Sequence, residues 1–200
     1  NGGFSSPGEW LQKLLLDGTL YHLWYFPALL LGVVLARNLA RLPALVALAA
    51  AAFLYLVGAG GDNYYGFTAS VVPLKRLYDS IFLVFSYTRS GLFFAPLFLL
   101  LGAAGLRWSR RASTAGFAFS LLGMTVEAFR LQTLGWPRHD SMYLLLPVCM
   151  VFLFSLLLGV NHGEDNRARR VSLLLYLLHP WAIVLVRGGA KALGLEHSLI

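Results

Sequence analysis

Long apolar runs constrain this chain more than any other feature of its sequence. They cover residues 20–36, 43–57, 91–106, 115–129, 142–160 and 171–186. The runs are continuous rather than alternating, which is typical of membrane helices, because a helix satisfies its own backbone hydrogen bonds in lipid. With 58% hydrophobic and 12% charged residues, the chain has too few polar side chains to cover a soluble globule. The sequence predicts an all-α, polytopic helical membrane protein with about six transmembrane helices.

Shorter segments are predicted at the membrane interface. Residues 9–16 place apolar side chains on one side of an amphipathic helix. Residues 81–85 are apolar but too few to span, so we expect a re-entrant or interfacial helix there. The glycine-rich stretch 58–61 is expected to end the second span.

Arginines in the short connections predict the orientation. These connections contain only two acidic residues, whereas their arginines are Arg37, Arg41, Arg107, Arg110, Arg111, Arg167, Arg169 and Arg170. Cytoplasmic loops carry such an excess, so the starts of the first, third and fifth spans should face the exterior of a multi-pass protein in the cytoplasmic membrane. The same loops account for the net charge of +7. The lipid bilayer is therefore the expected partner, and nucleic acid is not.

Polar side chains gather at the span ends predicted to face outward. They are His22, Trp24, Asp62, Asn63, Arg89, Glu127, His139 and Asp140. Prolines 27, 96, 147 and 180 lie in the outer or middle part of four spans, where each frees a carbonyl and can open a cavity. Simpler roles remain open: packing for the prolines, an interfacial belt for His22 and Trp24, and helix capping for Asp140.

A histidine inside the last span is a separate candidate. His179 has apolar neighbours on all sides, so it should face the bundle interior or a wet cavity, and Arg187 follows on roughly the same face. A structural and a functional role for His179 are equally consistent with this position. The histidines show no metal-ligand spacing, and Cys149 has no cysteine partner and reads as a core residue, so no metal site is expected.

Several strings resemble the later half of the acyltransferase-3 family membrane domain. The strings 21–29 and 175–180 are widespread in that superfamily, whereas 61–66, 89–91 and 139–142 are similar to its variant in the VanT-type membrane-bound serine/alanine racemases. The resemblance covers about residues 18–191. It implies that residues 1–200 form a partial domain, with the first spans and a C-terminal domain outside the chain.

This resemblance implies two functions. In the first, the domain takes up L-serine for a fused, dimeric racemase domain that carries the pyridoxal phosphate. Arg89 would bind the substrate carboxylate, and Asp62, Glu127 or Asp140 its ammonium group. In the second, it transfers an acyl group from acyl-CoA to an extracytoplasmic hydroxyl.

For acyl transfer, His22, Arg89, His139 and His179 would line the acceptor side of a tunnel. The catalytic histidine of the family lies upstream of Asn1, so this chain alone is not expected to catalyse the reaction. His22 and His179 remain the catalytic candidates within it. A plain membrane anchor is the third alternative, although an anchor needs no polar groups at four helix ends.

Overall fold

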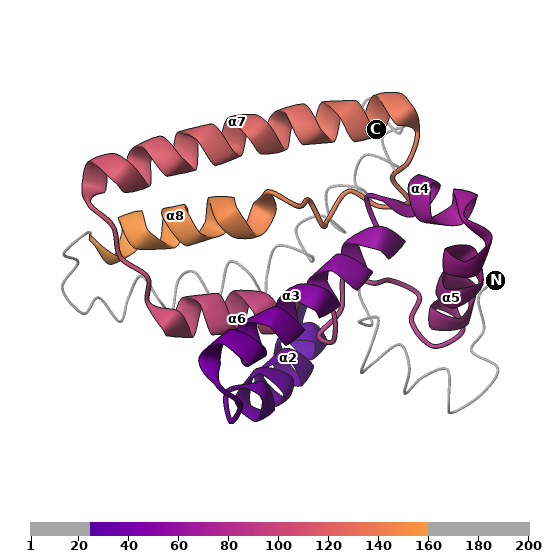
Figure 1. The fold of residues 1–200 in the computed structure, drawn as a ribbon, viewed down its shortest axis with the longest axis horizontal. Helices are drawn as coiled ribbons and strands as arrows, with labels where there is room; N and C mark the ends of the chain where they lie inside the picture. Colours follow the sequence, from indigo (N-terminus) through magenta and orange to yellow (C-terminus); the bar gives the residue numbers. More distant parts are fainter. Residues whose placement is uncertain (1–24, 160–200) are drawn as a thin grey trace, which may run out of the picture.

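The computed structural model describes residues 25–159, and this part of the chain is all-helical (Figure 1). Its helices are α2 (Tyr25–Leu39), α3 (Ala44–Gly61), α4 (Tyr65–Ser70), α5 (Val72–Phe82), α6 (Ala95–Ala104), α7 (Arg110–Leu134) and α8 (Leu146–Leu158). The predicted interfacial helix 9–16 and the last span lie outside the described residues.

Two of these helices, α3 and α7, are long and apolar enough to cross a membrane, with mean hydropathies of 2.0 and 1.2. The apolar parts of α2, α6 and α8 are shorter. Helix α7 leaves large apolar side chains exposed, among them Phe119, Leu122 and Phe129. An exposed apolar face of this kind suits contact with lipid. The predicted all-helical class is thus confirmed for residues 25–159, which contain two candidate membrane spans.

Helix α7 packs along α8, and the chain reverses direction between them (Figure 1). Near the start of α7, the Ser113 and Ser155 hydroxyls hydrogen bond at 2.9 Å, and the Trp108 N–H donates to the Ser155 hydroxyl at 3.1 Å. Gly116 faces the Phe152 ring so closely that a Cβ would lie 2.6 Å from it. Small residues therefore let these two helices approach each other.

The glycines at the end of α3 correct one prediction. The sequence was expected to stop a helix at residue 58, but α3 continues through Gly61. Gly58, Gly60 and Gly61 are buried, and a Cβ on Gly61 would lie 2.6 Å from Thr88 Cγ2 and 3.1 Å from the Tyr78 ring. These glycines admit neighbouring segments against the helix rather than breaking it.

Two prolines correct another prediction. Pro96 and Pro147 lie in the first turns of α6 and α8 rather than inside longer spans. Proline lacks a backbone N–H, and N–H groups in the first turn of a helix have no partner within that helix. Both prolines can therefore start a helix instead of bending one. The Tyr143 carbonyl, four residues before Pro147, accepts a hydrogen bond from the Tyr55 hydroxyl at 2.6 Å.

The segments that precede α6 and α8, residues 83–94 and 135–145, are consequently non-helical. The expected short helix at 81–85 is also wrong, since α5 ends at Phe82 and turns follow it. Both segments lie against the C-terminal end of α3, where Phe93 and Met142 join the buried core of Ala51, Tyr55, Ala59 and Leu97. Turns and irregular chain, rather than helix, thus carry Arg89, His139 and Ser141 at this end of the molecule.

Candidate functional site

The residues after α3 hold the segment that leads into α8. The Ser141 N–H donates to Asp62 Oδ1 and to Asn63 Oδ1, both at 2.9 Å, and the Met142 N–H donates to Asn63 Oδ1 at 2.8 Å. The Arg138 N–H donates to the Asp62 carbonyl at 3.0 Å. Because these side chains satisfy backbone donors that no helix satisfies, Asp62 and Asn63 fix the position of the 138–142 segment.

Arg89, from the segment before α6, joins Asp62, Asn63 and the 138–142 segment in one group, which we call the polar cluster. Its Nη1 donates to the Ser141 hydroxyl at 3.2 Å, and its guanidinium carbon lies 4.8 Å from the centre of the Tyr87 ring. The Tyr87 ring also packs against the His139 ring, and the centres of the two rings are 4.8 Å apart. All four side chains are partly exposed. They form the rim of the cluster, which we call the polar rim: Tyr87, Arg89, His139 and Ser141.

A layer of buried oxygens accompanies this rim. Asp62 is fully buried, and Thr88 and Ser90 are 1% exposed. Within the part of the chain that the structure describes, Asp62 Oδ2, Thr88 Oγ1 and Ser90 Oγ have no hydrogen-bond partner. Most buried polar atoms in proteins are paired, so these oxygens can bind a further polar atom or proton.

Burial controls the charge states of the cluster. Burial raises the pKa of Asp62 to about 6, although the Ser141 N–H and the Arg89 guanidinium oppose that rise. Burial, followed by the nearby Arg89 and Arg138, lowers the pKa of His139, so this imidazole is neutral at pH 7. At neutral pH the cluster therefore joins an arginine cation to carboxylates, with a neutral histidine at its rim.

Glu127 serves the fold. Its carboxylate accepts hydrogen bonds from the Tyr64 hydroxyl at 2.7 Å and from the Leu144 and Leu145 N–H groups at 2.6 and 3.1 Å. These N–H groups lead into α8, so the anion satisfies unpaired donors there and also suits the helix dipole. Glu127, rather than Asp140, thus binds the N–H groups just before α8, and the helix itself has no side-chain cap.

Asp140 lies on the surface beside the polar rim. It is exposed and accepts a hydrogen bond from Gln132 Nε2 at 2.7 Å. Both Asp140 and Arg89 act electrostatically on His139, so both lie near that ring. The other candidates named from the sequence, His22, Trp24, His179 and Arg187, lie outside the described residues.

The sequence brought together most of the cluster but not all of it. It named Asp62, Asn63, Arg89, His139 and Asp140, and the structure joins these residues at one end of α3. Tyr87 was not named, because its role depends on contact with His139, a residue distant in sequence, as well as on the nearby Arg89. Among residues 25–159, no three His, Cys, Asp or Glu side chains are arranged to hold a metal.

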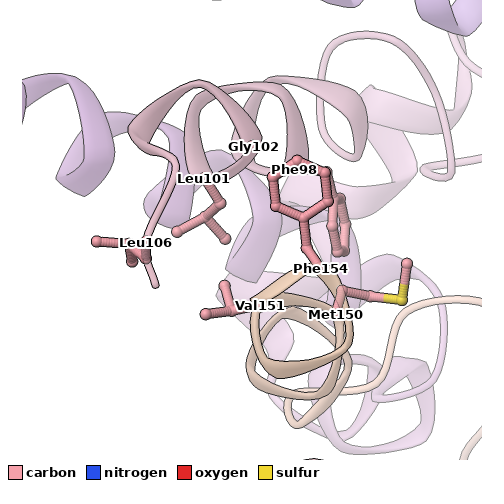
Figure 2. Close-up of a pocket in the computed structure, with 7 residues that line it drawn as sticks. All are labelled: Phe98, Leu101, Gly102, Leu106, Met150, Val151 and Phe154. Atoms are coloured by element: carbon pink, nitrogen blue, oxygen red, sulfur yellow. The ribbon is translucent and has the colours of Figure 1, made fainter. Parts of the chain in front are cut away.

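Apolar hollows, lined in part by exposed side chains, lie between the helices. One of about 160 Å³ lies between α6 and α8 and is lined by Phe98, Leu101, Gly102, Leu106, Met150, Val151 and Phe154 (Figure 2). A second, of about 460 Å³, shares Leu101 and Val151 with it and extends to Tyr55, Leu144 and Trp108. Together they follow α6 and α8 from the end near the polar cluster to the arginine-rich end.

Comparison with known proteins gives a consistent result. The model of an acyltransferase domain family matches residues 2–199. An amino-acid racemase of Enterococcus faecalis is 41% identical over 95% of this chain and 28% of its own length. A serine/alanine racemase of Enterococcus gallinarum is 42% identical over 90% of this chain and 27% of its own length.

A second amino-acid racemase of Enterococcus faecalis is 36% identical over 82% of this chain and 24% of its own length. The chain thus spans about a quarter of the length of the relatives it matches. No solved structure matches the chain.

Proposed function

The chain belongs to the acyltransferase-3 family, and we propose that it is part of the membrane domain of a VanT-type serine racemase, where it binds L-serine outside the cell and brings it in. In this proposal the domain crosses the bacterial cytoplasmic membrane several times, about six within this chain. The polar cluster faces outward. A fused cytoplasmic domain holds pyridoxal phosphate, racemises the imported serine and supplies any dimer contact.

The geometry around Arg89 is the observation that supports amino-acid binding best. Its partly exposed guanidinium is supported by the Tyr87 ring and has the Ser141 hydroxyl 3.2 Å from Nη1. A guanidinium suits a carboxylate in geometry and charge, and a hydroxyl beside it adds a further donor. The substrate carboxylate therefore binds at Arg89 and Ser141.

Asp140 is the acid best placed for the substrate ammonium group. It is exposed next to the polar rim, whereas Asp62 is fully buried and Glu127 already accepts three hydrogen bonds. A small zwitterion can then span from Arg89 to Asp140 across the neutral His139 ring. Asn63 contributes by positioning Ser141 and Met142 through their N–H groups.

Uptake of radiolabelled L-serine by the full-length protein in proteoliposomes tests this proposal. We expect Arg89→Ala to reduce uptake at low serine concentration by about 10- to 100-fold, since a hydrogen bond to a charged group is worth about 1.5–3 kcal/mol. Arg89→Lys should recover only part of it, because an ammonium lacks the planar fork.

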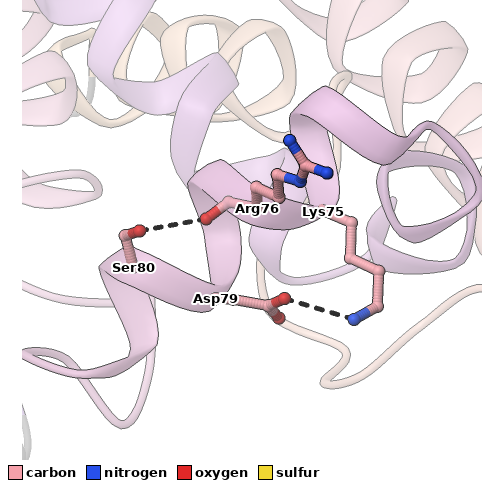
Figure 3. A network of polar contacts seen from close by, with 4 residues as sticks. All are labelled: Lys75, Arg76, Asp79 and Ser80. Carbon is pink, nitrogen blue, oxygen red and sulfur yellow. Dashed lines mark hydrogen bonds and ion pairs between the residues drawn. The ribbon is translucent and has the colours of Figure 1, made fainter.

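Arg76→Ala is the matched control for this experiment. Arg76 is exposed on α5, where its backbone carbonyl accepts a hydrogen bond from the Ser80 hydroxyl at 3.0 Å (Figure 3). Uptake by this variant should equal that of the wild type. Equal uptake by Arg89→Ala and wild type, at equal protein levels, would exclude Arg89 from substrate binding.

One observation favours a second function. The two apolar cavities along α6 and α8 reach Leu106 and Trp108. These residues flank Arg107, and Arg110 and Arg111 follow at the start of α7. An acyl chain suits such a lining, and arginines suit the phosphates of acyl-CoA. In this alternative the full-length protein acylates an extracytoplasmic hydroxyl, so incubation with labelled acetyl-CoA should label an acceptor, whereas the uptake function predicts no such label.

A further inference from the structure

We propose that Asp62 is a proton-binding site that couples amino-acid uptake to the proton gradient. A proton from outside the cell binds the Asp62 carboxylate as L-serine binds, and is released to the cytoplasm with it, so one proton enters with each amino acid. No other bond forms or breaks, and no electron is transferred. This inference rests on the uptake function proposed above and concerns a residue that does not itself contact the substrate.

The position of Asp62 is the first reason. Its side chain is fully buried, and Oδ1 accepts a hydrogen bond from the Ser141 N–H, while Oδ2 is buried without a donor. An ionised carboxylate oxygen without a donor is costly in such a place, whereas a protonated oxygen becomes a donor itself. A proton is also small enough to enter a closely packed site.

The surroundings of Asp62 hold further unpaired oxygens. Thr88 packs against Gly61, the residue before Asp62, and among residues 25–159 the Thr88 and Ser90 hydroxyl oxygens are buried without partners. No described group donates to Asp62 Oδ2, so protonation of that oxygen lowers the cost of burying the carboxyl.

Several charged and titratable groups surround Asp62. Arg89 lowers its pKa and Asp140 raises it, while burial has the largest effect and brings the pKa to about 6. The Arg138 backbone N–H donates to the backbone carbonyl of Asp62, and His139 is neutral. Other titratable side chains on the elements packed here include Tyr55, Tyr64, Tyr65, Tyr78, Tyr87, Glu127 and Tyr143, and α5 and α7 also carry the charged Lys75, Arg76, Asp79 and Arg130. A pKa of about 6 lies in the range where a proton gradient can load and unload the carboxyl.

The link to the substrate runs through Arg89. Its positive charge favours the ionised form of Asp62. A substrate carboxylate bound to Arg89 offsets that charge, so substrate binding raises the pKa of Asp62 and promotes proton uptake. By thermodynamic reciprocity, protonated Asp62 makes the site bind the substrate carboxylate more tightly.

Transport with and without a pH gradient tests the proposal. Wild-type full-length protein in proteoliposomes should concentrate L-serine when the outside is acidic, and a protonophore should abolish that concentration. Asp62→Asn imitates the protonated acid, since its amide oxygen still accepts from Ser141 and its amide nitrogen is a donor. This variant should still exchange internal for external serine but should lose all gradient-driven concentration.

Asp79→Asn is the matched control, because Asp79 pairs with Lys75 Nζ at 3.2 Å on the exposed surface of α5 (Figure 3). It should concentrate serine like the wild type. Gradient-driven concentration by Asp62→Asn at the wild-type level, or wild-type accumulation that a protonophore leaves unchanged, would overturn the proposal.

A second measurement separates this proposal from the uptake function. In purified ligand-free protein, the infrared carboxylic-acid band should titrate at about pH 6 in the wild type and in Asp79→Asn, and should be missing in Asp62→Asn. Absence of that titration overturns the proton site even if serine is transported. A wild type that titrates but neither binds nor transports serine instead contradicts the uptake function. If Asp62→Asn does not fold, wild-type serine affinity must rise as the pH falls through about 6, and a flat profile rejects the proposal.

Discussion

The carboxylate of Glu127 shows what one residue contributes at the junction of three segments. Oε1 accepts from the Tyr64 hydroxyl and the Leu144 N–H, and Oε2 accepts from the Leu145 N–H. Glu127→Gln keeps the shape but turns an NH₂ group toward one of these donors and removes the charge. We expect a loss of about 2 kcal/mol, seen as a lower midpoint of thermal unfolding in detergent.

The control for Glu127 is again Asp79→Asn, whose exposed ion pair should contribute little. Its unfolding midpoint should match that of the wild type. A midpoint for Glu127→Gln that also matches would show that water replaces the carboxylate at the start of α8, contrary to the role assigned here.

At the scale of elements, the end of α3 depends on having no side chain at residue 61. Gly61→Ala would bring a Cβ against Thr88 and the Tyr78 ring, which are both buried. Overpacking of this kind costs about 1–3 kcal/mol, so thermal unfolding should begin at a lower temperature. The segment that carries Arg89 would also shift, and serine uptake should fall with it.

Gly102→Ala is the counterpart of that substitution in α6, where nothing lies within 4 Å of the added Cβ. Alanine favours a helix over glycine by about 1 kcal/mol, so this variant should be as stable as the wild type or more stable. If both alanine variants were equally stable, close packing at Gly61 would not be the reason for the glycine.

The same elements show what the sequence could predict. Apolar runs identified the cores of α2, α3, α6, α7 and α8, because hydrophobicity along a helix is a local property. The predicted roles of Gly61 and Pro147 were wrong. A glycine can break a helix or admit a neighbouring segment, and a proline can bend a helix or start one, so only the packing decides between these roles.

The candidate site divides in a similar way. Arg89 and Asp62 were found because charges at the ends of apolar runs are unusual. The burial of Thr88 and the contact of Tyr87 with His139 depend on segments distant in sequence. Ordinary polar residues of this type carry no local signal of burial, so the sequence could not distinguish them from loop residues.

The whole molecule has two different ends, and this asymmetry gives a prediction about its orientation. The polar cluster joins the C-terminal ends of α3 and α7 to the segments that precede α6 and α8. The opposite end carries Arg107, Arg110 and Arg111. At about 1.5 Å per residue, the 25 residues of α7 are long enough to separate these ends by a bilayer. Because basic residues stay in the cytoplasm, the polar cluster should face outward.

Cysteine labelling can test this orientation, since the chain has one cysteine and Cys149 is buried. In a Cys149→Ala background, Thr133→Cys places a thiol at the exposed C-terminal end of α7, and Ala112→Cys places one at its exposed start. A membrane-impermeant maleimide added to intact cells should label position 133 and spare position 112 until the membrane is permeabilised. The reverse pattern would put the polar cluster in the cytoplasm, where Arg89 and Asp62 could not receive an amino acid and a proton from outside, and both proposals would fail together.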